Sequence, residues 1–142
     1  MSDPLRALDE ATIGDPQARW TNRLILYIRL MASVSMLKGL YHWTLVCGIG
    51  GVGAESIFEV APLAWKAATI FFAVIDLVAA VGLWLAAAWG GVVWLTAAIS
   101  MAAVEVFFPQ IFGGQAWVVA AESAAVAVYL VLALLAGRER PD

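Results

Sequence analysis

Four long apolar segments constrain the fold of this chain more than any other feature. They cover residues 24–48, 63–88, 92–108 and 116–136. A membrane-spanning helix needs about 20 mainly apolar residues, whereas a membrane β-strand needs about 9–11 residues that alternate between apolar and polar. These segments are too long for strands and show no such alternation. The sequence therefore predicts an all-α integral membrane protein, a four-helix bundle of up-down topology in a lipid bilayer.

Composition supports this class. Of the 142 residues, 63% are hydrophobic and 13% are charged, whereas soluble domains have about 45–50% apolar and about 25% charged residues. No basic patch is present, which argues against nucleic-acid binding. Cys47 is the only cysteine, so an internal disulfide and multi-cysteine metal sites are excluded.

The connections predict how the helices follow one another. The stretch AWGGV (88–92) predicts a tight turn between the second and third helices, and FPQIFGGQ (108–115) predicts a short polar loop before the fourth. We expect an N-terminal arm over 1–22, a four-helix domain over 23–137 and a short tail over 138–142.

Basic residues predict the orientation in the membrane. Those that flank the four segments are Arg6, Arg19, Arg23, Arg138 and Arg140. The loops on the opposite side hold Lys66 together with Glu55 and Glu59. Because basic residues concentrate on the cytoplasmic side, both termini are predicted to be cytoplasmic.

Ionisable residues interrupt all four segments. Apart from Arg29 and Lys66, which lie nearer to segment ends, they are Lys38, His42, Asp76, Glu105 and Glu122. With a helical rise of 1.5 Å per residue, most of them lie roughly 20 Å from the cytoplasmic edge. A charge facing lipid at this depth costs about 2.5–3.5 kcal/mol, so the side chains are expected to point inward and form one polar layer.

Charge balance within this layer is incomplete. Three carboxyl groups face Lys38 and at most one further cation, His42, so at least one acid is expected to be uncharged. Our hypothesis is that Lys38 pairs with Asp76 or Glu105 and that Glu122 is the uncharged acid. Three roles stay open: helix association through hydrogen bonds, a ligand or proton site, and contact with another membrane subunit.

A family resemblance joins these features. The segment LYIRLMASVSMLKGLYHW (26–43) resembles the first helix of DoxX-like membrane proteins, and residues 71–108 are similar to that family's second and third helices. This chain has Gly39 after Lys38, where the family usually has glycine before lysine, and it has Asp76 where glutamate is commoner. The resemblance implies a four-helix bundle of the bacterial inner membrane, in some members linked to quinone or sulfur redox chemistry or to membrane complexes.

A ligand-binding or proton-coupled cluster is the predicted site. Its members are Lys38, His42, Asp76, Glu105, Glu122, Tyr41 and Tyr129. A quinone suits such a set, because His42 offers a hydrogen bond and Tyr41, Trp43, Met101 and Tyr129 offer ring contacts.

Other cofactors and roles are less favoured by the residues. A haem needs an axial ligand besides the lone His42, and a metal site of His42, Glu105 and Glu122 lacks a recognised spacing. No catalytic constellation is recognised, so enzymatic activity is left open. The alternative is a non-catalytic accessory or structural subunit of a larger membrane complex, or a homo-oligomer.

Overall fold

The computed structural model describes residues 19–49 and 57–139. Within this part, four helices are long and apolar enough to cross a membrane. They are α2 (Arg19–Val46), α4 (Leu63–Trp84), α5 (Ala88–Phe107) and α7 (Ala116–Arg138), joined by the short helices α3 (Ile57–Val60) and α6 (Pro109–Phe112). The predicted all-α membrane fold is confirmed.

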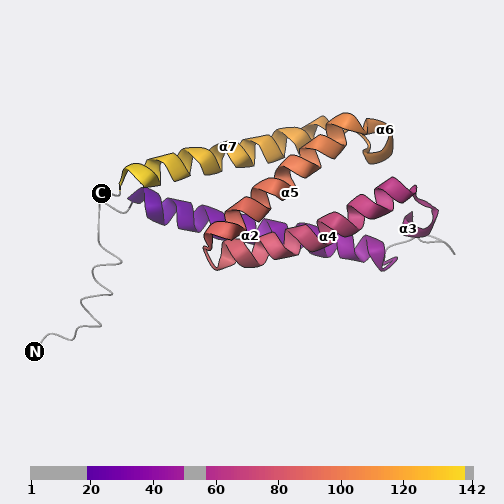
Figure 1. Cartoon of the computed structure of the whole chain (residues 1–142), viewed down its shortest axis with the longest axis horizontal. Coiled ribbons are helices and arrows are strands. Elements are labelled where there is room, and N and C mark those ends of the chain that lie inside the picture. The colour runs from indigo at the N-terminus through magenta and orange to yellow at the C-terminus, as the bar shows by residue number, and fades with distance from the viewer. Residues whose placement is uncertain (1–18, 50–56, 140–142) are drawn as a thin grey trace, which may run out of the picture.

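The four long helices form an up-down bundle in which the first and last helices are neighbours. Helix α2 packs against α4 and α7, and α5 packs against the same two helices. Figure 1 shows the start of α2 and the end of α7 at one end of the bundle, here the terminus end, with α3 and α6 at the other, the loop end. The start of α2 and the end of α7 therefore lie on one side of the bundle, while the cytoplasmic location of the termini stays a prediction.

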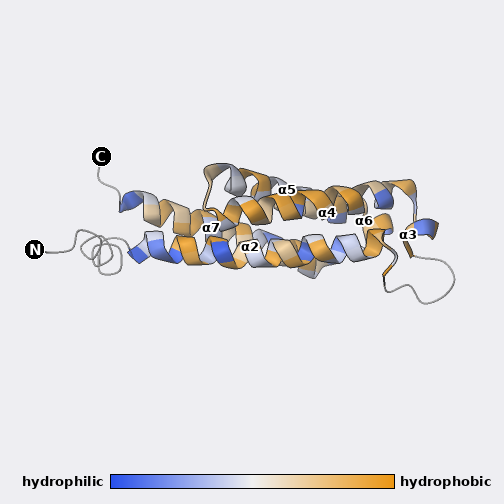
Figure 2. Cartoon of the chain, turned by 90° about the horizontal axis from the view of Figure 1, so that it is seen from below, coloured by the Kyte–Doolittle hydropathy of each residue, from blue (hydrophilic) through white to orange (hydrophobic). Residues whose placement is uncertain are grey.

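Small residues form most of the interior, and large apolar residues cover the outside. Buried alanines include Ala32, Ala73, Ala79, Ala80, Ala97 and Ala98. Leu26, Leu37 and Leu134 are among the exposed large side chains, and Figure 2 shows apolar colour over much of the length of the long helices. Close packing through small residues is typical of helices in lipid, where burying large apolar groups brings little gain.

The reversal between α4 and α5 differs from the prediction. The chain turns at Leu85–Ala87, where Ala86 has a φ of 51° and the Ala87 N–H donates to Gly82 O at 3.0 Å. The predicted turn at 88–92 is wrong, because Gly90 belongs to α5 and packs against Gly82 of α4. A Cβ atom on either glycine would overlap the backbone of the other. These glycines permit close helix contact.

Helix α2 begins earlier than predicted, inside the predicted arm. The Glu139 carboxylate, which follows α7, accepts hydrogen bonds from the N–H groups of Trp20 at 2.8 Å and Thr21 at 3.0 Å. Such N–H groups have no partner within a helix, so this distant acid caps α2 at Arg19. The rest of the arm (1–18), residues 50–56 and the tail residues 140–142 lie outside the described residues.

The predicted polar loop at 108–115 contains the short helix α6. Gly113 and Gly114 follow it with φ values of 96° and 58°, a conformation that glycine adopts at little cost. They redirect the chain from α6 into α7 and so place Gln115 beside α5.

Candidate functional site

Lys38 lies at the centre of the predicted cluster. Its Nζ atom is 2.5 Å from Glu122 Oε1 of α7 and 3.8 Å from Asp76 Oδ1 of α4. The helical spacing of α2 directs Lys38 between these two helices, both of which pack against α2. One ammonium group thus links three of the four membrane helices.

Asp76 is the most enclosed acid of the cluster. Its residue exposure is 0%, and neither carboxyl oxygen has a hydrogen-bond partner in the part of the chain that is described. His42 Nδ1 is 3.9 Å from Asp76 Oδ2 but 2.9 Å from the Lys38 carbonyl oxygen. Because a carbonyl only accepts, His42 donates from Nδ1 to Lys38 O, and in the neutral ring Nε2 is then an acceptor.

Glu105 bonds to the backbone at the start of α7 rather than to Lys38. Its Oε2 atom accepts a hydrogen bond from the Gln115 N–H at 2.9 Å, which ties α5 to the start of α7. Lys38 pairs with Glu122 and Asp76. Of the two predicted alternatives, Asp76 is the partner of Lys38 and Glu105 is not, and Glu122 is a further partner that was not predicted. Its statement that one acid is uncharged stays a prediction.

A cavity of about 580 Å³ opens beside this cluster, here called the loop-end cavity. In Figure 1, the pair α5 and α7 separates from the pair α2 and α4 toward the loop end. All four long helices and α6 contribute to its wall. Its polar members are Lys38, Tyr41, His42, Thr69, Glu105, Gln115 and Glu122, and its apolar members include Trp65, Phe72, Met101, Phe112 and Trp117.

Sequence reasoning missed part of this wall. Trp65, Phe72, Phe112 and Trp117 were not among the predicted site residues, yet all four line the cavity. Their sequence signal is an aromatic residue within the loop-end part of a helix, which is also typical of residues at the membrane interface. Only the packing of the helices distinguishes the two roles.

The two predicted tyrosines lie in different places. Tyr41 lines the loop-end cavity, and its ring centroid is 5.7 Å from that of His42. Tyr129 instead packs edge-on against Trp94, with ring centroids 5.6 Å apart, beside the core residues Ala32 and Leu83. Tyr129 is not part of the cavity wall, whereas Met101 is.

The cluster offers no ready-made metal cage. Over residues 19–49 and 57–139, no group of three or more His, Cys, Asp and Glu side chains is close enough to hold a metal ion. The chemistry that the described side chains offer is hydrogen bonding and charge, from Lys38, His42 and the carboxylates.

Comparison with known proteins gives one match. A family model described as "Family of unknown function (DUF6163)" matches residues 22–140. The chain belongs to this family. No curated protein and no solved structure matches it. Membership in DUF6163 assigns no ligand, so the chemistry of the loop-end cavity has to indicate the function.

Proposed function

We propose that this DUF6163 protein binds a small amphipathic molecule of the quinone type in the loop-end cavity. The observation that carries the proposal is the position of Lys38 and His42 in the wall of a partly aromatic cavity within membrane-spanning helices. Its volume of about 580 Å³ lies within the range of about 300–1,000 Å³ that is usual for small-molecule sites.

Polar recognition would come from Lys38. An ammonium group has three N–H donors, and the contact with Glu122 uses one of them. The Lys38 side chain is 26% exposed, so a further donor is available to a carbonyl or phenolate oxygen of the ligand. His42 adds a ring nitrogen to the same wall.

Ring contacts would come from the aromatic side chains. Trp65 and Phe72 of α4 and Trp117 of α7 bound the cavity on two sides. Flat rings pack well against such side chains. An isoprenoid-like tail can leave between helices into the bilayer, because lipid surrounds the bundle.

Proton exchange is compatible with the same site. Glu122 lines the cavity and contacts Lys38, and Asp76 lies behind Lys38, closed off from solvent. Carboxyl groups beside a cationic donor can give a proton to a quinone headgroup that an external electron donor reduces, or take one from a quinol that an external acceptor oxidises. This extends the proposal from binding to proton-coupled binding and requires no catalytic step.

Fluorescence titration with a short-chain benzoquinone tests the proposal. The quinone quenches nearby tryptophans, and Trp65 and Trp117 line the cavity. We expect saturable quenching of the purified protein in mild detergent and an affinity at least about tenfold weaker in Lys38→Met, which corresponds to 1.4 kcal/mol. Lys66→Met serves as the matched control, because the half-buried Lys66 donates to Glu59 O and does not line the cavity.

A cavity-filling pair keeps the test decisive if Lys38→Met does not fold. Ala121 lines the cavity, whereas its exposed neighbour Ala120 does not. Ala121→Phe should weaken quenching and Ala120→Phe should not. If the binding were saturable and its affinity were unchanged in both Lys38→Met and Ala121→Phe, the proposal would be overturned.

An accessory-subunit role is the second candidate. The exposed side of α2 carries Arg29 and Ser33, and the exposed Cys47 follows the helix; a partner helix could contact these groups. Native mass measurement after gentle purification distinguishes the two: a stable larger complex without bound quinone favours the subunit role. We likewise propose that the protein is related to DoxX-like proteins and that it resides in a bacterial inner membrane.

A further inference from the structure

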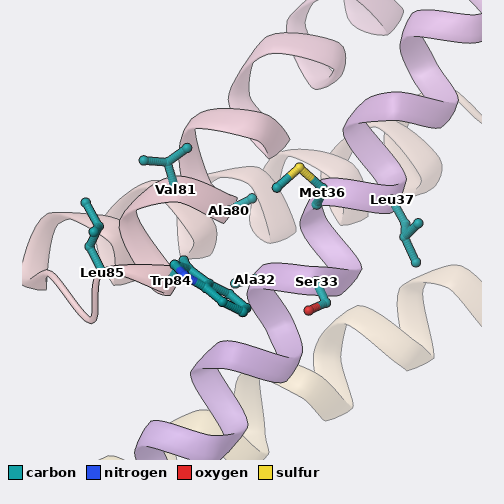
Figure 3. A pocket seen from close by; sticks show the side chains of 8 residues that line it. All are labelled: Ala32, Ser33, Met36, Leu37, Ala80, Val81, Trp84 and Leu85. Carbon is teal, nitrogen blue, oxygen red and sulfur yellow. The ribbon is translucent and has the colours of Figure 1, made fainter.

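A second hollow, here the α2–α4 groove, lies on the outer face of the bundle. Its volume is about 470 Å³. The residues that line it are Ala32, Ser33, Met36, Leu37, Ala80, Val81, Trp84 and Leu85. In Figure 3, Met36 points toward Ala80, and the Trp84 ring extends toward Ala32. Apart from Ser33, the lining is apolar.

The helix lengths shape this groove. Helix α4 ends at Trp84, beside Ala32, whereas α2 continues past that level to Arg19 at the terminus end. Further along the pair, Gly39 approaches Leu77 so closely that a Cβ atom would contact the leucine at 2.8 Å. The helices are therefore tightly packed toward the loop end, and the groove lies on the terminus-end side of that contact.

Arg29 lies on the side of α2 that leads out of this groove. It precedes Ser33 by four residues and Met36 by seven, a spacing that places all three on one face of a helix. Arg29 is exposed, and none of the ion pairs among the described residues involves it. An exposed guanidinium within a membrane helix is costly unless its long side chain reaches the headgroup region.

We propose that the α2–α4 groove and Arg29 together bind an anionic phospholipid. One acyl chain lies along the apolar lining between Leu37 and Trp84, and the phosphate contacts Arg29. Guanidinium groups bind phosphate through paired N–H donors, and the groove supplies complementary apolar surface beside that charge. A second copy in symmetric contact would instead bring two Arg29 side chains to one interface, where like charges repel.

Tryptophan quenching by brominated lipid tests this site. The full-length protein is reconstituted in phosphatidylcholine vesicles that contain either brominated phosphatidylglycerol or brominated phosphatidylcholine at the same fraction. The contribution of Trp84 is obtained by comparison with Trp84→Phe. We expect the quenching of Trp84 to report a preference of about fivefold for the anionic lipid over phosphatidylcholine. This is the preference that one basic residue near an anionic membrane surface provides.

Two variants with matched controls define the outcome. Arg29→Gln should abolish the preference for phosphatidylglycerol, whereas Arg23→Gln, which removes the same charge from another face of α2, should retain it. Val81→Phe, which fills the groove, should reduce quenching by both lipids. Val78→Phe, at another exposed position of α4 that does not line the groove, should not. Both valines are exposed, so folding should survive.

Three results would overturn the proposal. These are equal quenching by the two lipids in the wild-type protein, a preference that survives Arg29→Gln, and a Trp84 that no lipid quenches. In the last case, cross-linking between copies through position 81 would identify a second copy as the occupant. These measurements do not involve the loop-end cavity, so their outcome is independent of the quinone titration.

Discussion

Lys38 Nζ and Glu122 Oε1 are 2.5 Å apart and join α2 to α7 at the edge of the loop-end cavity. The same ammonium group is 3.8 Å from Asp76 Oδ1. Two acids on two helices therefore share one cation. The contact holds the bundle together where α2 and α4 separate from α5 and α7, and it leaves the cation facing the cavity.

Removal of Lys38 should destabilise the bundle. Lys38→Met leaves Glu122 and Asp76 without their cation, so we expect the free energy of unfolding to fall by about 2–3 kcal/mol, toward the low end for a buried pair because Lys38 is partly exposed. Thermal unfolding in detergent measures the change. The double variant Lys38→Met/Glu122→Gln should lose less than the sum of the single variants, and strict additivity would show that the pair has no energetic coupling.

The buried Asp76 carboxyl group should lower the stability of the bundle. Since neither carboxyl oxygen has a hydrogen-bond partner among the described residues, Asp76→Val should raise the free energy of unfolding by about 1 kcal/mol while Lys38 keeps Glu122. Thr69→Val is the control, because the buried Thr69 hydroxyl donates to Trp65 O at 2.8 Å, and it should bring no such gain. A clear loss of stability in Asp76→Val would mean that attraction to Lys38 outweighs burial.

The glycine contact between α4 and α5 should tolerate no side chain. A Cβ atom at Gly82 would overlap Gly90, so Gly82→Ala should destabilise by about 1–3 kcal/mol. At Gly137 of α7 nothing lies within 4 Å of an added Cβ, so Gly137→Ala should be neutral or stabilising by about 0.5–1 kcal/mol. Equal effects of the two substitutions, measured by thermal unfolding, would contradict this packing.

Capping of α2 by Glu139 should depend on pH. Desolvation alone would raise the pKa of Glu139, but hydrogen bonds from the Trp20 and Thr21 N–H groups and the Thr21 hydroxyl, with the charge of Arg19, together lower this pKa below its ordinary value of 4.5. A lowered folded-state pKa means that the cap stabilises fully above about pH 4.5 and is lost as the pH falls through the folded-state value. Hydrogen exchange of the first α2 amides should therefore accelerate at acidic pH.

Glu139→Gln is the control for that measurement. It should expose the same amides at all pH values, because a neutral amide binds N–H groups more weakly than a carboxylate. If hydrogen exchange of these amides in the wild-type protein changed with pH only as unstructured amides do, the Glu139 cap would not stabilise the start of α2.

Orientation in the membrane can be tested at Cys47. It is the only cysteine of the chain and is exposed near the loop end. If the termini are cytoplasmic, a membrane-impermeant maleimide added to intact cells or spheroplasts should label Cys47. Cys47→Ser should abolish the labelling. Labelling only after permeabilisation would reverse the predicted orientation.

The amino-acid sequence by itself determined the class of the fold and which charged side chains had to face inward. Long apolar segments leave a membrane helix as the only way to satisfy the backbone, so the spans 63–88 and 116–136 agreed with α4 and α7 to within a few residues. Likewise, Lys38, Asp76 and Glu122 had to face inward, since lipid cannot solvate them. These results follow from local chemistry and helical rise.

Only the tertiary structure decided which groups meet. Glu105 and Glu122 were predicted at the same depth, yet Glu105 accepts from Gln115 whereas Glu122 reaches Lys38, because rotation of each helix and the course of α6 set the direction of each side chain. Gly90 read as a turn residue, but its role depends on Gly82 of a neighbouring helix. Contacts of this kind join residues far apart in the chain, and no local pattern specifies them.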